Sequence, residues 1–386
     1  MKTAAPPIPV VATRGARLVL ADGREVVDGI ASWWTAAHGY NHPHIIEAMR
    51  VQLETMPHVM FGGLAHEPAY VLARRLADVL PGRLNHAFFA ESGSVAVEIA
   101  MKMAVQFWLN QGARGRTKFV SFKGGYHGDT LATMMVSDPE DGMHALFAGV
   151  LPAQPVVTLP RDEVGETALA DLLAARGPEI AALIVEPLVQ GAGGMVFHEP
   201  DVLLIFDEIF TGFGRTGSLF AMEQAGVEPD IVTLSKALTG GVAPLSCAVA
   251  SDRVFEGFLS DDPRAALMHG PTYMANPLAC AAANASLDLF EQGAWRADVP
   301  RIEAGLRAGL APCRALAGVA DVRVRGAIGV VELQKAPDRA SLTARFLDLG
   351  VWIRPLDRIV YLTPPLIATD EEIAALTGAI RTALGA

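Results

Sequence analysis

Apolar runs and helix-like stretches alternate through the middle of this chain, and this alternation constrains the fold more than any other feature. The clearest runs are Ile180–Val185, residues 202–206 and Ile231–Leu234. Continuous apolar strands are typical of parallel sheets that helices cover on both faces. Further strands are expected at 87–89 and Lys118–Phe122, and a helix at 94–109. The pattern predicts an α/β domain built on a mainly parallel sheet.

A second, smaller domain is expected toward the C-terminus, because 386 residues exceed one ordinary domain. The expected helices and strands there are 278–292, 301–317, 322–324, 328–331 and Ile359–Leu362. We predict a large domain over 46–285 and a small α+β domain over 286–386. Residues 1–45 carry an expected strand pair, Arg17–Leu20 and 26–28, and are assigned to the small domain and an interface.

Composition narrows the class of protein. The formal net charge is −11, which disfavours a nucleic-acid binder that relies on phosphate neutralisation. Cys247, Cys280 and Cys313 lie far apart, so neither a disulfide framework nor a metal site is expected. No apolar run reaches the length of a membrane span, and the proline-broken N-terminus is a poor signal peptide. A cytoplasmic enzyme is the expectation.

An aspartate and a lysine each follow a predicted strand. Asp207 ends the run Val-Leu-Leu-Ile-Phe-Asp, and Lys236 comes shortly after Ile231–Leu234. Alone, the acid reads equally as a helix cap, and the lysine more readily as a side chain that reaches solvent. Together at the ligand-binding edge of a parallel sheet they suit pyridoxal phosphate. The lysine would form a Schiff base, and the acid would keep the pyridine nitrogen protonated.

Two segments offer groups for a phosphate and a ring. Gly93 and Ser94 open the predicted helix, where free N–H groups suit a phosphate, although in isolation an ordinary helix cap is the more frequent case. The segment 124–130 follows a strand and contains Tyr126, which is able to lie flat on an aromatic ring. The alternative there is a turn with Asp129 as a cap, and His127 reads as a packed imidazole.

Aromatic and basic residues offer a substrate pocket. Trp33 and Trp34 are adjacent, so both cannot lie on one face of a strand, and one is expected to line a pocket or an interface. Arg354 follows an apolar run and suits a carboxylate, although an ordinary surface arginine is the more frequent case.

Taken jointly, these segments resemble the class III, fold-type I pyridoxal-phosphate aminotransferases. The strongest matches are Phe-Asp-Glu-Ile-Phe-Thr-Gly-Phe-Gly-Arg-Thr-Gly at 206–217 and Ser-Lys-Ala-Leu-Thr-Gly-Gly at 235–241. The resemblance covers nearly the whole chain. Within the class it is strongest to the 7,8-diaminopelargonate synthases of biotin synthesis, on the segments 28–34, 60–63, 92–98, 269–274 and 350–355.

The resemblance implies a role for each matching residue. Lys236 is the Schiff-base lysine and proton shuttle, Asp207 pairs with the pyridine nitrogen, and Tyr126 stacks on the ring. Gly93 and Ser94 hold the phosphate, with Thr272 reaching in from the other subunit of a homodimer. The implied substrate-pocket residues are Trp33, Trp34, Tyr126, Asp129, Arg215, Gly270 and Arg354.

The sequence departs from the family in two places. A His-Pro-Tyr segment whose tyrosine contacts substrate is expected near the N-terminus, and none precedes Pro9. The family also carries a helix between the glycine-rich 191–195 segment and the Asp207 strand, and about one helix is absent here. The connection 186–202 is therefore short for a parallel crossover.

The resemblance implies a transaminase that transfers an amino group from S-adenosylmethionine to 7-keto-8-aminopelargonate. One alternative is an ω-amino-acid, ornithine or 4-aminobutyrate transaminase. The other is a ligand-binding protein without catalysis on the same scaffold, which the retained lysine and aspartate argue against.

Overall fold

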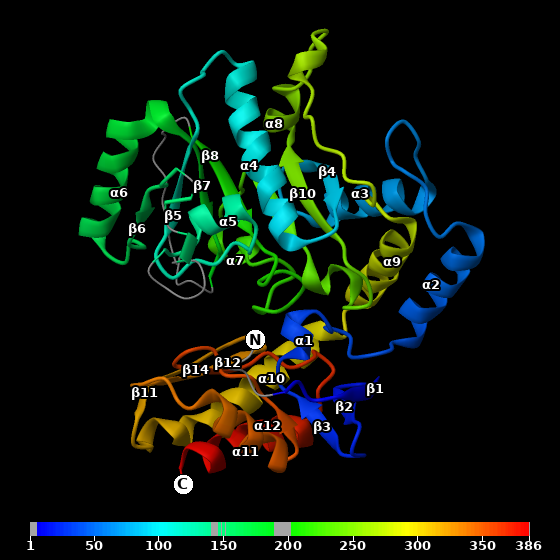
Figure 1. Ribbon diagram of the computed structural model, residues 1–386, viewed down its shortest axis with the longest axis vertical. Helices are drawn as coiled ribbons and strands as arrows, with labels where there is room; N and C mark the ends of the chain where they lie inside the picture. The colour runs from blue at the N-terminus through cyan, green and yellow to red at the C-terminus, as the bar shows by residue number, and fades with distance from the viewer. Residues whose placement is uncertain (1–5, 140–145, 148, 151, 189–201, 386) are drawn as a thin grey trace.

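A computed structural model describes residues 6–139, 146–147, 149–150, 152–188 and 202–385. Figure 1 shows two parts. The larger one is built around a seven-stranded sheet, and the smaller one contains the N-terminal and C-terminal segments of the chain. Within the described residues, no helix combines the length and the apolar character that crossing a membrane requires.

The seven-stranded sheet is the framework of the larger part. In spatial order its strands are β4 (Leu84–Ala90), β10 (Ser246–Ser251), β9 (Ile231–Leu234), β8 (Leu203–Asp207), β7 (Ile180–Val185), β5 (Lys118–Phe122) and β6 (Val156–Val157). β10 runs antiparallel to β4 and β9, and every other neighbouring pair is parallel. The predicted mainly parallel sheet is confirmed.

Helices bury both faces of this sheet, which explains why its strands are continuously apolar. Ile184 and Ile205 lie in one core cluster with α4 (Gly93–Asn110). Leu183 and Phe206 lie in another with α3 (Glu67–Val79) and α9 (Pro277–Gln292). The remaining helices of this part are α2 (Pro43–Thr55), α5 (Leu131–Val136), α6 (Glu163–Arg176), α7 (Met222–Ala225) and α8 (Asp252–Glu256), with 3-10 helices η2 (Gly177–Glu179), η3 (Lys236–Thr239) and η4 (Pro263–Ala265).

Two small sheets form the lower part of Figure 1. The first has the order β1 (Val10–Arg14), β2 (Arg17–Leu20), β3 (Glu25–Asp28) and β13 (Val351–Trp352), and the second has β11 (Val319–Arg325), β12 (Ile328–Leu333) and β14 (Ile359–Leu362). Their helices are α10 (Trp295–Leu310), η5 (Ala311–Ala315), α11 (Arg339–Asp348) and α12 (Asp370–Leu384).

The predicted N-terminal strand pair has its partner in the C-terminal part of the chain. β3 pairs in parallel with β13, with Val27 opposite Val351 and Asp28 opposite Trp352. The assignment of residues 1–45 to the small domain and an interface stays a prediction. The domain boundaries at 45 and 285 stay a prediction.

The two sequence departures fall largely outside the described residues. β7 and β8, which the 186–202 connection joins, are parallel neighbours in the sheet. Most of that connection, 189–201, and with it the 191–195 segment, lies outside the described residues, as do residues 1–5 at the N-terminus.

Candidate active site

Asp207 and Lys236 meet at the carboxyl edge of the large sheet. Asp207 is the last residue of β8 and lies opposite Thr233 of β9, while Lys236 begins η3 directly after β9. The Thr233 hydroxyl donates to Asp207 Oδ1 at 3.3 Å. The sequence-based expectation that parallel strand ends bring these residues together is confirmed.

The Asp207 carboxylate is buried, and both of its oxygens accept hydrogen bonds. Its side chain binds His127 Nδ1 through Oδ2 at 2.8 Å, and the amide of Ile209 donates to Oδ1 at 3.1 Å. Burial works to lower the pKa of His127, but the hydrogen bond and the charge of Asp207 outweigh it and raise that pKa. The hydrogen bond between the two side chains is therefore buried, out of contact with bulk water.

Lys236 occupies an aromatic recess. Its Nζ lies 4.0 Å from the ring centroid of Trp34 and 5.7 Å from that of Phe210. Burial lowers the pKa of Lys236 to about 8, although the charges of Asp207 and Glu186 work in the opposite direction. A lysine of this kind holds a larger share of neutral amine near pH 7 than an exposed one, which suits a nucleophile.

The first turn of α4 and the 124–130 segment form a tight backbone cradle. The Ser92 side chain caps α4 by accepting from the Val95 amide, and Ser94 Oγ accepts from the amide of Asp129 at 3.1 Å. A Cβ on Gly128 would lie 2.4 Å from Ser94 Oγ, and the φ of Gly128 is +129°. Only glycine permits this approach. The helix-cap interpretation is met by Ser92, and Gly93 begins the helix. Phosphate binding by Gly93 and Ser94 stays a prediction.

Tyr126 lies in the 124–130 segment, and 44% of its surface is exposed. Burial of the rest, together with a hydrogen bond to Asp129, raises the pKa of its hydroxyl. Its amide donates to Glu186 Oε2 at 3.1 Å. Glu186 was not singled out from the sequence, yet it follows a buried strand as Asp207 does, so the same signal points to it.

The two tryptophans divide their roles, as their adjacency indicated. They lie on α1 (Ala31–Trp34), and Trp34 packs against Phe210 and Tyr361 at centroid distances of 4.5 and 5.9 Å. Trp33 is 51% exposed and lies under the Arg354 guanidinium, 5.2 Å from the ring centroid. Within the described residues, the buried Trp34 Nε1 has no hydrogen-bond partner. Aromatic side chains thus wall the space beside Lys236.

Arg215 lies close enough for its charge to act on Lys236, but its guanidinium is buried. Its Nη1 donates to the carbonyl of Pro364 at 2.7 Å, and burial lowers its pKa to about 10. These contacts show that Arg215 ties the segment after β8 to the C-terminal part. A direct role in binding substrate stays a prediction.

Gly270 and Thr272 lie in an exposed segment on the outside of the larger part. The segment packs against α4, where Lys102 Nζ donates to the carbonyl of Met268, and against His58, which stacks near Tyr273. Their expected contribution to the site of a second subunit stays a prediction.

Comparisons with known proteins agree with this geometry. The family model described as aminotransferase class-III matches residues 1–384. The chain belongs to the class III aminotransferases. An adenosylmethionine-8-amino-7-oxononanoate aminotransferase from Mycobacterium leprae is 47% identical over 394 residues, covering 97% of this chain and 90% of that protein.

Solved structures of aminotransferases superpose on the chain nearly from end to end. The adenosylmethionine-8-amino-7-oxononanoate aminotransferase of Methanocaldococcus jannaschii matches with a TM-score of 0.89 at 31% identity, covering 98% of this chain and 93% of that one. An amine transaminase from an uncultivated Pseudomonas species, in its PLP-bound form, matches with a TM-score of 0.88 at 31% identity, covering 99% and 96%. The predicted fold class and enzyme class are confirmed.

Proposed function

We propose that this aminotransferase uses pyridoxal phosphate to transfer the amino group of S-adenosylmethionine to 7-keto-8-aminopelargonate (8-amino-7-oxononanoate). The product is 7,8-diaminopelargonate, a precursor of biotin. The observation that carries the proposal is the aromatic wall at Lys236, where Trp34 lies 4.0 Å from Nζ and Trp33 stacks under Arg354. This wall belongs to the segments that resemble the 7,8-diaminopelargonate synthases, and the M. leprae relative bears the corresponding name.

The residues present fit pyridoxal phosphate. The first-turn amides of α4, at Gly93 and Ser94, have no carbonyl partner inside the helix and suit a phosphate. The close approach of Gly128 to Ser94 brings a second backbone segment to the same place. Asp207 would hold the ring nitrogen, Tyr126 would lie against the ring, and Lys236 would hold the aldehyde. When bound, the group supplies a carbonyl that condenses with amines and a ring that accepts electrons.

The chain's own residues then bind substrates and move one proton. Lys236 Nζ takes the proton from the donor carbon that carries the amine and returns a proton on the acceptor side. Its lowered pKa makes both protonation states accessible near neutral pH. Arg354 offers a charge to a substrate carboxylate, and Trp33 and Trp34 exclude water from the apolar part of the acceptor. Asp129 orients Tyr126 through the hydroxyl contact.

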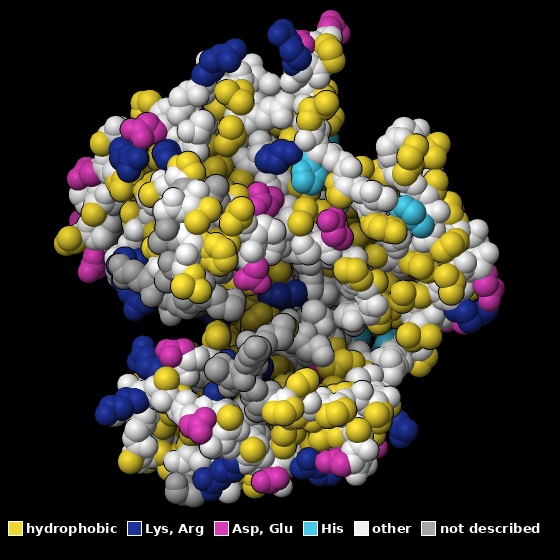
Figure 2. Space-filling model, in the orientation of Figure 1, with side chains coloured by type: hydrophobic (Ala, Val, Ile, Leu, Met, Phe, Trp, Pro, Cys, Tyr) yellow, Lys and Arg dark blue, Asp and Glu magenta, His cyan; other side chains and the backbone are white. Residues whose placement is uncertain are grey.

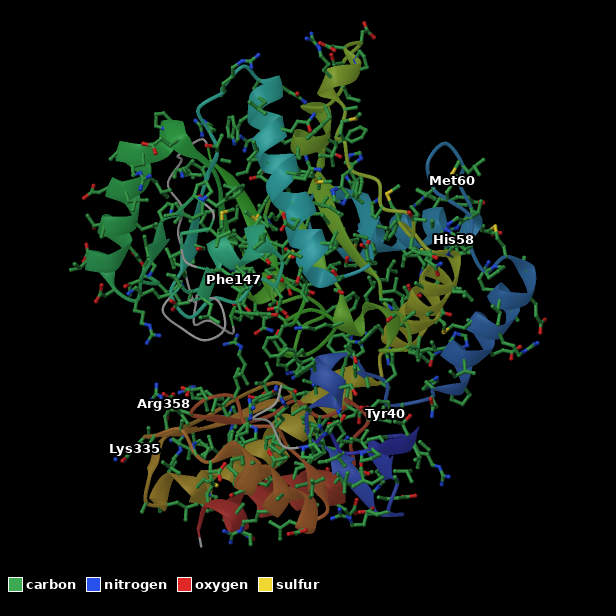
Figure 3. The ribbon with its side chains drawn as sticks, in the orientation of Figure 1. Tyr40, His58, Met60, Phe147, Lys335 and Arg358 are labelled. Carbon is green, nitrogen blue, oxygen red and sulfur yellow. The ribbon has the colours of Figure 1, made fainter. Side chains whose placement is uncertain are left out.

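We also propose that the enzyme is a homodimer in which Gly270 and Thr272 complete the partner's site. Figure 2 shows hydrophobic side chains gathered over α2 and the α2–α3 loop, the side on which Figure 3 labels His58 and Met60. The exposed apolar residues there include Val51, Leu53, Met60, Leu64 and Tyr70, and Met268 and Tyr273 lie on the segment of Gly270. A large apolar surface of this kind is typical of obligate interfaces.

A half-reaction tests the donor. The purified holoenzyme is mixed with S-adenosylmethionine alone, and the visible absorption of the cofactor is followed by stopped flow. We expect the band to disappear, and to return when 7-keto-8-aminopelargonate is added. The Lys236→Ala variant serves as the control and should show neither change.

A second candidate is an amine or ω-amino-acid transaminase, because an amine transaminase superposes with almost the same TM-score. The same assay separates the two candidates. Loss of the band with ornithine, 4-aminobutyrate or a simple amine, and none with S-adenosylmethionine, would overturn the first proposal.

A further inference from the structure

The tryptophan pair lies on a turn of the wrong hand for L-amino acids. Ala31, Ser32, Trp33 and Trp34 have φ angles of +45°, +46°, +56° and +72°. The amide of Trp34 donates to the carbonyl of Ile30, and that of Thr35 to Ala31, both at 2.9 Å. These four residues therefore form one left-handed helical turn. Residues other than glycine adopt this conformation singly, and rarely in succession.

A turn of this kind persists only where its surroundings hold it. One buried carboxylate does so here. The amide of Ile30 donates to Asp28 Oδ1 and the amide of Ser32 to Asp28 Oδ2, each at 2.9 Å. The Tyr40 hydroxyl donates to the same Oδ2 at 2.5 Å and also contacts Ser32 Oγ. The carboxylate thus fixes the backbone both before and inside the turn.

Backbone hydrogen bonds anchor both holding residues to the turn between β1 and β2. Asp28 ends β3, where its amide donates to the carbonyl of Ala16 at 2.8 Å. The amide of Tyr40 donates to the carbonyl of Gly15 at 2.7 Å. Figure 3 shows Tyr40 at the junction of α1 and the first small sheet. The position of the first small sheet therefore determines, through Asp28 and Tyr40, the position of the left-handed turn.

We infer that Asp28 and Tyr40 are positioning residues for substrate: they hold the left-handed turn that places Trp34 beside Lys236 and Trp33 under Arg354. The inference rests on the proposed function and deepens it, because it assigns the geometry of the acceptor pocket to two residues that act through the turn. When the hydrogen bonds of Asp28 and Tyr40 to the turn are lost, residues 31–34 relax toward ordinary backbone angles. The aromatic wall then moves while Asp207 and Lys236 stay in place.

The test uses Asp28→Asn and Tyr40→Phe, which preserve side-chain shape, and a glycine placed in the turn. Ser32→Gly removes the steric cost of a positive φ at an exposed position. The double variant Asp28→Asn/Ser32→Gly is therefore a rescue. Asp22→Asn is the matched control, because Asp22 Oδ1 accepts from the amide two residues on, at Arg24, in an exposed hairpin turn.

Hydrogen–deuterium exchange of residues 29–36 in the holoenzyme is the first measurement, and it depends on no substrate. We expect Asp28→Asn to raise the exchange rate of these amides by about tenfold, because the turn loses the carboxylate that accepts hydrogen bonds from its backbone amides. Tyr40→Phe should act more weakly, the double variant should return toward wild type, and Asp22→Asn should change nothing in this segment.

Steady-state kinetics with whichever acceptor the enzyme turns over is the second measurement. The KM for the acceptor should rise about tenfold in Asp28→Asn with kcat changed less than about threefold, since binding and not chemistry is affected. The double variant should recover most of that loss. Unchanged exchange and KM in Asp28→Asn, or a raised KM that the glycine does not relieve, would overturn the inference. A wrong choice of substrate leaves the exchange result standing, so the two failures are distinguishable.

Discussion

His127 Nδ1 lies 2.8 Å from Asp207 Oδ2, and both side chains are buried at the carboxyl edge of the large sheet. The His127 imidazole occupies the side of the Asp207 carboxylate that faces the 124–130 segment. It thereby couples the residue proposed to hold the ring nitrogen to the segment that carries Tyr126. This relationship leads to the first prediction.

Replacing His127 with Asn should weaken retention of pyridoxal phosphate. The variant loses a charge-assisted bond that fixes Asp207, and such bonds contribute about 1.5–3 kcal/mol, or roughly tenfold to a hundredfold in affinity. Equilibrium dialysis of the cofactor measures the change. The chain offers a matched control in His86, which pairs with Asp252 at 3.0 Å near the surface. His86→Asn should retain the cofactor as wild type does, and equal retention by both variants would contradict the assignment.

The pH dependence of cofactor loading should report the pKa of Lys236. Only the neutral amine attacks an aldehyde, and burial lowers this pKa to about 8. The loading rate of the cofactor-free chain should therefore rise about tenfold per pH unit below 8 and level off above it. Stopped-flow absorbance between pH 6 and 10 measures the profile. A rate that keeps rising to pH 10 would indicate a lysine with an ordinary pKa.

Gly128→Ala should damage the cradle at α4. The new Cβ would lie 2.4 Å from Ser94 Oγ, and the φ of +129° is unfavourable for alanine. Strain of this kind costs about 1–3 kcal/mol. We expect lower thermal stability together with lower cofactor retention. Gly112→Ala is the control, because Gly112 also has a positive φ but nothing lies within 4 Å of its Cβ. It should lose stability through its φ of +82° alone, without a steric clash, and should retain the cofactor.

The three cysteines should be chemically silent in the folded protein. Cys247, Cys280 and Cys313 are free and buried, and burial raises the pKa of each thiol, to about 12 for Cys280. Because the thiolate is the reactive form, a thiol reagent such as dithionitrobenzoate should react slowly with native protein. All three should titrate at once in guanidinium chloride. Rapid reaction of even one thiol before unfolding would contradict the buried placement.

The sequence was sufficient for the elements that follow from burial and strand direction. Asp207 ends β8 and Lys236 follows the neighbouring parallel strand β9, so local pattern alone places them at one edge. Ile180–Val185 was predicted at its observed bounds, because a strand covered on both faces has an unmistakable apolar run.

Other features depended on contacts between distant residues. Nothing local predicts the left-handed turn at 31–34, since its residues disfavour that conformation and Tyr40 and Asp28 stabilise it through tertiary contacts. Glu208 was likewise missed. Its carboxylate accepts from the amides of Ala221 and Met222 inside the core, and burial raises its pKa to about 7. No pattern in the sequence distinguishes it from a solvent-facing acid.

The parallel pairing of β3 with β13 has a consequence for how selectivity is able to change. The amide of Gly29 donates to the carbonyl of Trp352 at 2.9 Å, so the turn bearing Trp33 and Trp34 and the segment bearing Arg354 leave the same pair of strands side by side. A small tilt of that pair would shift together the two segments that we propose to line the acceptor pocket. Asp207 on β8 and Lys236 on η3 would keep their geometry. Evolution is thereby free to exchange one amine or ketone for another without rebuilding the chemical centre.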